Sequence, residues 1–142
     1  MFNEPIYQHD GSYAKEHGEL DQYRASMKLN IACKEAIEGA IRSNFDGMHL
    51  KKAAITEVMD DFGEARVGLV LANTLQRKQT DGRFSRSNKE WAMEQDVCGM
   101  NKDAYDDTDC RYRLCVESHP AVLDGFVSVF RRELKEREEQ RK

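Results

Sequence analysis

The chain has 142 residues, of which 39% are hydrophobic and 34% are charged, and its formal net charge is −4 at pH 7. This length favours a single domain over residues 1–142, and the acidic balance argues against a protein that coats nucleic acid through a large basic field. No apolar run approaches the roughly 20 residues that cross a bilayer, and the N-terminus lacks the basic start and apolar centre of a signal peptide. We therefore expect a cytoplasmic protein without a membrane span.

The first part of the chain predicts an extended arm followed by two helices. Residues 1–9 form the arm, and Asp10 can cap a short helix over residues 11–17. Gly18 can end that helix, because glycine readily adopts the left-handed conformation that follows many helices. Residues 19–42 form the longest helical candidate, since their apolar residues recur at helical spacing with alanines between them.

Two more helices are expected before the middle of the chain. Residues 50–61 carry the apolar stripe of an amphipathic helix, which Gly63 ends. Residues 64–78 follow at once, with an acidic residue near the start and cations near the end, as the helix dipole favours. The run VGLVLAN within them is also compatible with a strand, but its period and the leading EAR favour a helix.

The stretch TDGRFSRSNKEWA, residues 80–92, is basic within an acidic chain and holds the only tryptophan. It begins with the turn dipeptide DG. Ser87 and Glu90 then match a capping box, in which a hydroxyl and a carboxylate satisfy amides at a helix start. We expect a short helix over residues 88–95 with Trp91 facing inward.

The last part of the chain predicts an acidic loop and a C-terminal helix. Residues 96–109 lack a regular pattern, and the alternation from Tyr112 to Val116 mildly supports a short extended segment. A helix then begins near Pro120, because proline is tolerated in the first turn. Residues 135–142 are almost all charged, and we expect them to fray. The predicted fold is therefore all-α, a compact bundle of five to six helices.

Charge is segregated along the chain, and this asymmetry identifies two candidate binding segments. Residues 76–89 hold five cations and one acid, a balance of +4, which leaves −8 for the rest of the chain. The adjoining residues 94–109 hold six acids and one lysine, a balance of −5. The candidate binding residues are Arg83, Phe84, Arg86 and Lys89 in the basic segment and Asp103, Asp106 and Asp107 in the acidic one.

Four explanations for the basic segment stay open. Arginine next to aromatic residues is typical of protein interface hot spots, and it also serves phosphate and base contact. The segment could instead be an ordinary helix connection whose charges face water, or it could pair with the acidic residues that follow. A balance of +4 supports only a few phosphate contacts, so a partner protein is favoured over nucleic acid.

Cys98, Cys110, Cys115 and His119 have the spacing C-x11-C-x4-C-x3-H and are candidate zinc ligands. However, they lack the C-x2-C pair of most structural zinc sites, and Cys115 lies between apolar residues as a small buried side chain would. Without a secretion signal, free thiols are expected, and no cofactor is expected. No nucleophile motif or glycine-rich phosphate loop is present, so we expect a protein that is not an enzyme.

Four stretches carry a resemblance to a known family: YRASMKLNIACKEAIEGAI, FDGMHL, VLANTLQRKQTDGRFSRSNKEWA and ESHPAVLDGFVSVFRREL. They resemble an uncharacterised domain-of-unknown-function family of plasmids, conjugative elements and phages of gut Gram-positive bacteria. The resemblance covers roughly residues 5–134 and implies an all-helical fold without an established activity or catalytic residue. It also implies that the four cysteines are not required, which counts further against zinc.

The genetic setting implied by this resemblance suggests a function. Small acidic proteins of mobile elements often bind host or defence proteins, so we expect a non-enzymatic binding protein. The acidic segment would suit an anti-CRISPR or other anti-defence inhibitor that occupies a basic channel of an RNA-guided nuclease. The alternative is a nucleic-acid-binding accessory protein that uses Arg83, Arg86 and Lys89. The oligomeric state is not predicted.

Overall fold

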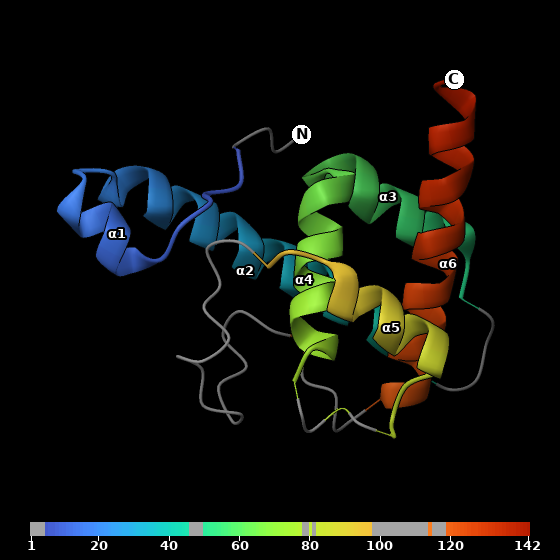
Figure 1. Cartoon of the computed structure of the whole chain (residues 1–142). Coiled ribbons are helices and arrows are strands. Elements are labelled where there is room, and N and C mark those ends of the chain that lie inside the picture. Colours follow the sequence, from blue (N-terminus) through green and yellow to red (C-terminus); the bar gives the residue numbers. More distant parts are fainter. Residues whose placement is uncertain (1–4, 46–49, 78–79, 81, 98–113, 115–118) are drawn as a thin grey trace.

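The structure is a computed structural model, and it describes residues 5–45, 50–77, 80, 82–97, 114 and 119–142. This part of the chain contains six α-helices and no strand, which confirms the predicted all-α fold (Figure 1). In chain order the helices are α1 (Gly11–Glu16), α2 (Leu20–Arg42), α3 (Lys52–Phe62), α4 (Glu64–Leu75), α5 (Arg86–Glu94) and α6 (Pro120–Gln140). Within these described ranges, none of the helices combines the length and the apolar character that a bilayer crossing requires.

Helix α4 lies at the centre of the helical body. It packs against α2, α3 and α5, and nine of its twelve residues are buried. A helix that is apolar on nearly all sides must be covered on all sides, and α4 is covered in this way. Helix α6 packs against α3, α2 and α5 and closes the body, whereas α1 and the first turns of α2 extend away from it (Figure 1). The strand alternative for VGLVLAN is therefore wrong.

The N-terminal arm and its helix follow the local signals of the sequence. The Asp10 side chain accepts a hydrogen bond of 2.8 Å from the Tyr13 amide and so caps α1, as predicted. Gly18 has a φ of 70° at the end of this helix. The arm is held at Tyr7, which is buried and whose amide donates to the Ser26 hydroxyl at 3.0 Å.

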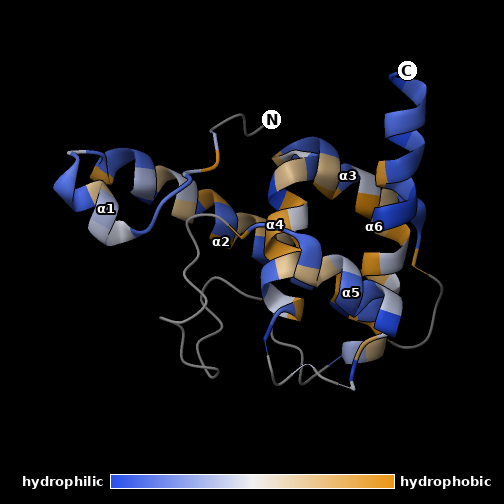
Figure 2. Ribbon diagram, viewed as in Figure 1, coloured by the Kyte–Doolittle hydropathy of each residue, from blue (hydrophilic) through white to orange (hydrophobic). Residues whose placement is uncertain are grey.

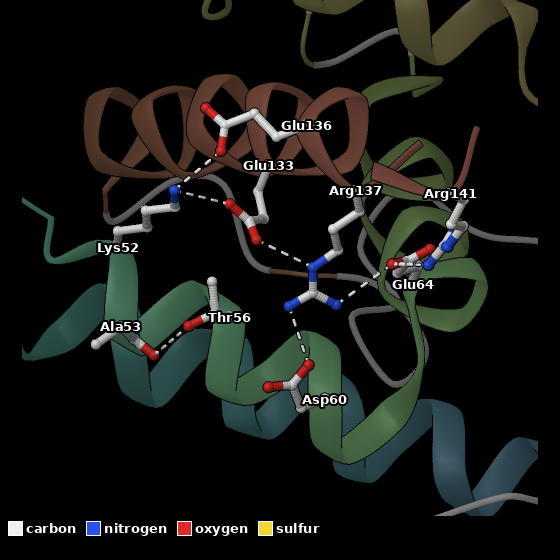
Figure 3. A network of polar contacts seen from close by, with 9 residues as sticks. All are labelled: Lys52, Ala53, Thr56, Asp60, Glu64, Glu133, Glu136, Arg137 and Arg141. Atoms are coloured by element: carbon white, nitrogen blue, oxygen red, sulfur yellow. Dashed lines mark hydrogen bonds and ion pairs between the residues drawn. The ribbon is translucent and has the colours of Figure 1, made fainter. Parts of the chain in front are cut away.

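The C-terminal helix is longer than the sequence predicts. The charged residues 135–142 were expected to fray, but α6 is helical through Gln140. Figure 3 shows the physical reason: Arg137 pairs with Asp60 and Glu64 at 2.9 and 3.3 Å, and Arg141 pairs with Glu64 at 2.6 Å. These ion pairs join the end of α6 to α3 and α4, although this end is hydrophilic along its whole surface (Figure 2).

The remaining predicted boundaries are close to the observed ones. Helix α3 begins at Lys52 rather than at residue 50, and α4 ends at Leu75 rather than at residue 78. The predicted acidic loop lies outside the described residues apart from its first two positions. The extended segment from Tyr112 to Val116 also lies outside them except for Leu114, which is buried in the core.

Candidate binding surface at helices α5 and α6

Helix α5 begins two residues earlier than the capping box predicts. Its N-cap is Ser85, whose hydroxyl accepts from the Asn88 amide at 3.3 Å. Ser87 instead lies within the first turn, where its hydroxyl accepts a bond of 2.9 Å from Arg131. Glu90 pairs with Arg86 at 2.9 Å rather than closing a capping box. The predicted role of Ser87 is therefore wrong.

A polar network between α5 and α6, centred on Asn88, explains why α5 is capped by Ser85 rather than by Ser87. The buried Asn88 amide nitrogen donates to the Asp124 carboxylate at 2.8 Å and to the Ser128 hydroxyl at 3.0 Å. The same carboxylate accepts from the Ser85 amide at 3.0 Å, which fixes Ser85 at the helix start. Arg131 donates to the side-chain amide oxygen of Asn88 at 2.9 Å. Two stretches that are distant in sequence thus specify one interhelical contact.

Lys89, a predicted binding residue, contacts the protein's own backbone. Its ammonium group donates to the carbonyl oxygens of Leu75 and Arg77 at 2.6 and 3.0 Å and also to the Thr80 hydroxyl. These carbonyls lie at the C-terminal end of α4, where the helix leaves acceptors unsatisfied and where positive charge is favourable. Lys89 therefore stabilises the junction of α4 and α5 from a half-buried position.

The other three basic-segment candidates divide between core and surface. Phe84 is only 9% exposed and belongs to the hydrophobic core, so it is not available at the surface as a binding residue. Arg83 and Arg86 are exposed, and 93% of the Arg86 side chain is accessible. The Arg83 amide donates to the Thr80 carbonyl at 3.0 Å, which closes the predicted turn and directs Phe84 inward.

A groove of about 620 Å³ lies between α5 and α6, next to this basic segment. Its cationic lining comes from α6 and consists of Arg131, Arg132 and Lys135, whereas Glu138 is its carboxylate. Arg132 and Lys135 are exposed. Sequence reasoning missed these α6 cations because it attributed basic character to the stretch before α5. The sequence signal for them was the run RRELK in α6. Its two arginines lie about one helical turn before the lysine, so the three cations can share one face.

Trp91 lies at the edge of the groove in a half-buried position. Its ring meets the Phe130 ring in an edge-to-face arrangement, with 6.0 Å between the centroids. The Arg131 guanidinium carbon lies 5.9 Å from the Trp91 ring centroid, a cation–π distance. The predicted inward orientation of Trp91 is therefore confirmed on its Phe130 side, while the residue still borders the groove.

The metal and acidic candidates fall largely outside the described residues. Cys98, Cys110 and Cys115 lie there, as do Asp103, Asp106 and Asp107. His119 is described: it precedes the first residue of α6, and its ring meets the Phe45 ring at a centroid distance of 3.8 Å. Among residues with described positions, no three His, Cys, Asp or Glu side chains come close enough to hold a metal ion.

Cys33, the cysteine that the structure does describe, is fully buried in the core. Burial raises the pKa of its thiol to about 12, although the nearby Arg66 charge acts in the opposite direction. A thiol of this kind is unreactive, because the thiolate is the nucleophile and the metal ligand. Cys33 therefore has a packing role.

Comparison with known proteins identifies the family without adding an activity. No curated protein and no solved structure matches the chain. A family model described as "Protein of unknown function (DUF3849)" matches residues 6–135, which span all six helices of the described fold apart from the last residues of α6. The chain therefore belongs to the DUF3849 family of proteins of unknown function.

Proposed function

We propose that this protein is a non-enzymatic binding protein that contacts a partner protein through the surface of α5 and α6. The observation that carries the proposal is that two α6 cations are available to a partner. Arg132 and Lys135 are exposed, line the groove and have no carboxylate of the described residues within ion-pair distance. Arg137, on the same helix, and Arg141, directly after its end, are both engaged by carboxylates. Arginine and tryptophan side chains at a groove are typical of interface hot spots.

The partner in this proposal is a host or defence protein, and the setting is a mobile element of a gut Gram-positive bacterium. An RNA-guided nuclease is one such partner, which would make the protein an anti-CRISPR or another anti-defence inhibitor in the cytoplasm. This part rests on the family resemblance and on the acidic balance of −5 over residues 94–109. The non-enzymatic part rests on the sequence, in which no nucleophile motif or phosphate-binding loop occurs.

Nucleic-acid binding is the second candidate, because Arg83 and Arg86 are exposed in the stretch whose Ser85 and Ser87 line the groove. One of its three expected contacts is engaged elsewhere, since Lys89 binds backbone carbonyls, and Phe84, the aromatic residue beside them, is in the core. The remaining cations would meet few phosphates. If nucleic acid were the ligand, its binding would weaken steeply with salt and fall in the double variant Arg83→Ala, Arg86→Ala.

Affinity capture tests the proposal directly. The tagged protein is mixed with purified host and defence proteins, including RNA-guided nucleases, and with a host lysate that has been treated with DNase and RNase. We expect a protein partner that survives this treatment, and loss of activity if the partner is a nuclease. Binding without inhibition would support the partner protein and contradict the anti-defence role. Retention of nucleic acid alone from an untreated lysate would contradict the proposal.

A further inference from the structure

The groove between α5 and α6 has a charge opposite to that of the whole chain. Three cations and one carboxylate line it, a formal balance of +2, whereas the chain carries −4. Apart from Trp91 and Leu134 its remaining lining is polar, with the hydroxyls of Ser85, Ser87 and Ser128 on the walls. An anionic ligand with hydrogen-bond acceptors matches this lining, because the cations and the hydroxyls of Ser85 and Ser87 can donate to it, whereas the Ser128 hydroxyl donates to the Asp124 carbonyl.

The groove cations differ in their availability. Arg131 is committed to the fold: it donates to Ser87 and Asn88 at 2.9 Å and lies against the Trp91 ring. Arg132 and Lys135 make no such contact with described residues. They lie three positions apart on α6, so they occupy one face of the helix and can meet the same ligand.

A second groove, of about 510 Å³, lies beyond Trp91, and its described lining holds no cation. It is lined by apolar residues of α4 and α6 and by the carboxylate side chains of Glu64 and Asp96. Trp91 and Leu134 line both grooves and therefore separate them. An acidic ligand finds cations in the groove with Arg132 and Lys135 and none in the described lining of the neighbouring one. The surface therefore selects a position for it.

The aromatic residues of this region favour a protein ligand over single-stranded nucleic acid. Proteins that bind single strands stack bases on open aromatic faces. Trp91 already has the Arg131 guanidinium and the Phe130 ring beside it, and Phe84 is in the core. A balance of +2 also neutralises few phosphates, whereas it matches a pair of carboxylates on a protein segment.

We infer that the α5–α6 groove binds an acidic segment of the partner protein, with carboxylates paired to Arg132 and Lys135. This inference rests on the proposed function, and it names the chemistry by which the partner is recognised. Trp91 borders the bound segment and is the only tryptophan of the chain, so its fluorescence reports occupation of the groove.

The experiment is a titration of the full chain with a short polyglutamate peptide at low salt. The fluorescence of Trp91 measures the binding. We expect a saturable change with polyglutamate and none with polylysine. The double variant Arg132→Glu, Lys135→Glu should bind polyglutamate at least roughly tenfold more weakly, because both partners would then carry negative charge. Both substituted side chains are exposed, so the thermal melting of the variant should match that of the wild type.

The matched control is the double variant Arg24→Glu, Lys28→Glu. Both residues are exposed on α2, which does not line the groove, and the change in net charge is the same. We expect this variant to bind polyglutamate within about twofold of the wild type, apart from the long-range effect of net charge. Equal weakening in the two double variants would overturn the inference, because the attraction would then come from overall charge.

Two further outcomes would also overturn it. One is a wild-type Trp91 signal that polyglutamate leaves unchanged. The other is tighter binding of a short single-stranded DNA that also depends on Arg132 and Lys135, which would assign the groove to nucleic acid. The proposed function fails separately. If the captured partner protein binds the Arg132→Glu, Lys135→Glu variant as well as the wild type, the α5–α6 surface is not the binding site, and only the binding role of the protein stands. If the wild type captures no partner protein, the proposed function is wrong even when polyglutamate binds.

Discussion

Lys89 and Gln76 join α4 and α5 from both sides. Lys89, on α5, binds the end of α4, and Gln76, which follows α4, binds the end of α5. The Lys89 ammonium, on α5, donates to carbonyl oxygens at the end of α4 at 2.6 and 3.0 Å. The Gln76 amide nitrogen, directly after α4, donates to two carbonyl oxygens at the end of α5 at 2.8 and 2.9 Å. The final carbonyls of a helix have no partner within it, so this reciprocal arrangement satisfies both ends and fixes the two helices relative to each other.

We expect the substitution Lys89→Met to destabilise the protein by about 1–3 kcal/mol, since it keeps most of the apolar stem but removes the donor to the carbonyl oxygens of Leu75 and Arg77. Gln76→Ala should cost roughly 1 kcal/mol for the same reason. Because the two residues hold one junction, the double variant should deviate from additivity by at least about 0.5 kcal/mol. Urea denaturation of all four proteins measures this cycle. A Lys89→Met protein as stable as the wild type would show that Lys89 contributes nothing to the junction.

Phe84→Ala and Arg83→Ala separate core from surface at neighbouring positions. The phenylalanine is buried in the hydrophobic core, so its truncation should cost about 3 kcal/mol. Arg83 is exposed, and its truncation should change the stability by no more than about 0.5 kcal/mol. Thermal or urea unfolding measures both. Equal losses in the two variants would contradict the placement of Phe84 in the core.

Cys33 should resist thiol reagents as long as the protein is folded. Its pKa of about 12 leaves roughly a thousandfold less thiolate than an ordinary cysteine has at mildly alkaline pH, and the side chain is inaccessible. A variant with serine at positions 98, 110 and 115 keeps Cys33 as its single thiol. Iodoacetamide followed by mass spectrometry should label it only in denaturant. Rapid and complete labelling of the native variant would refute the buried position.

Acid should weaken the attachment of α6 through Glu133. Hydrogen bonds from Arg137 and then from Lys52 lower the pKa of the Glu133 carboxyl group (Figure 3). Because the folded pKa lies below the unfolded one, the contribution of Glu133 is present above the unfolded pKa and is lost as the pH falls through the folded pKa. Glu133→Gln should therefore lower the free energy of unfolding by roughly 1–2 kcal/mol at neutral pH. In acid the variant should then lose less additional stability than the wild type does.

Thermal melts at neutral and acidic pH measure this difference. The control is Glu57→Gln, which changes an exposed residue of α3 in the same way. It should leave the pH dependence close to that of the wild type. A Glu133→Gln protein with the full acid sensitivity of the wild type would indicate that other carboxylates are responsible.

The helices were predictable from the sequence where their limits depend on nearby residues. The Asp10 cap, the end of α3 at Gly63 and the start of α6 at Pro120 are each determined within a few positions, and the structure confirms them. The start of α5 was not predictable in this way. Two serines could cap it, and the choice of Ser85 over Ser87 depends on hydrogen bonds to Asp124 and Arg131 of a helix far along the chain.

The candidate site likewise combines features that the sequence determines with features that depend on the tertiary structure. The sequence by itself determined the all-α fold, the segregation of charge and the turn before α5, because periodicity, composition and local turn chemistry carry that information. Only the tertiary structure decided which cations are available to a partner. Lys89 binds the end of a neighbouring helix and Arg137 binds carboxylates, whereas Arg132 and Lys135 line an open groove. Charge is a property of each residue, but its use depends on the groups that folding brings beside it.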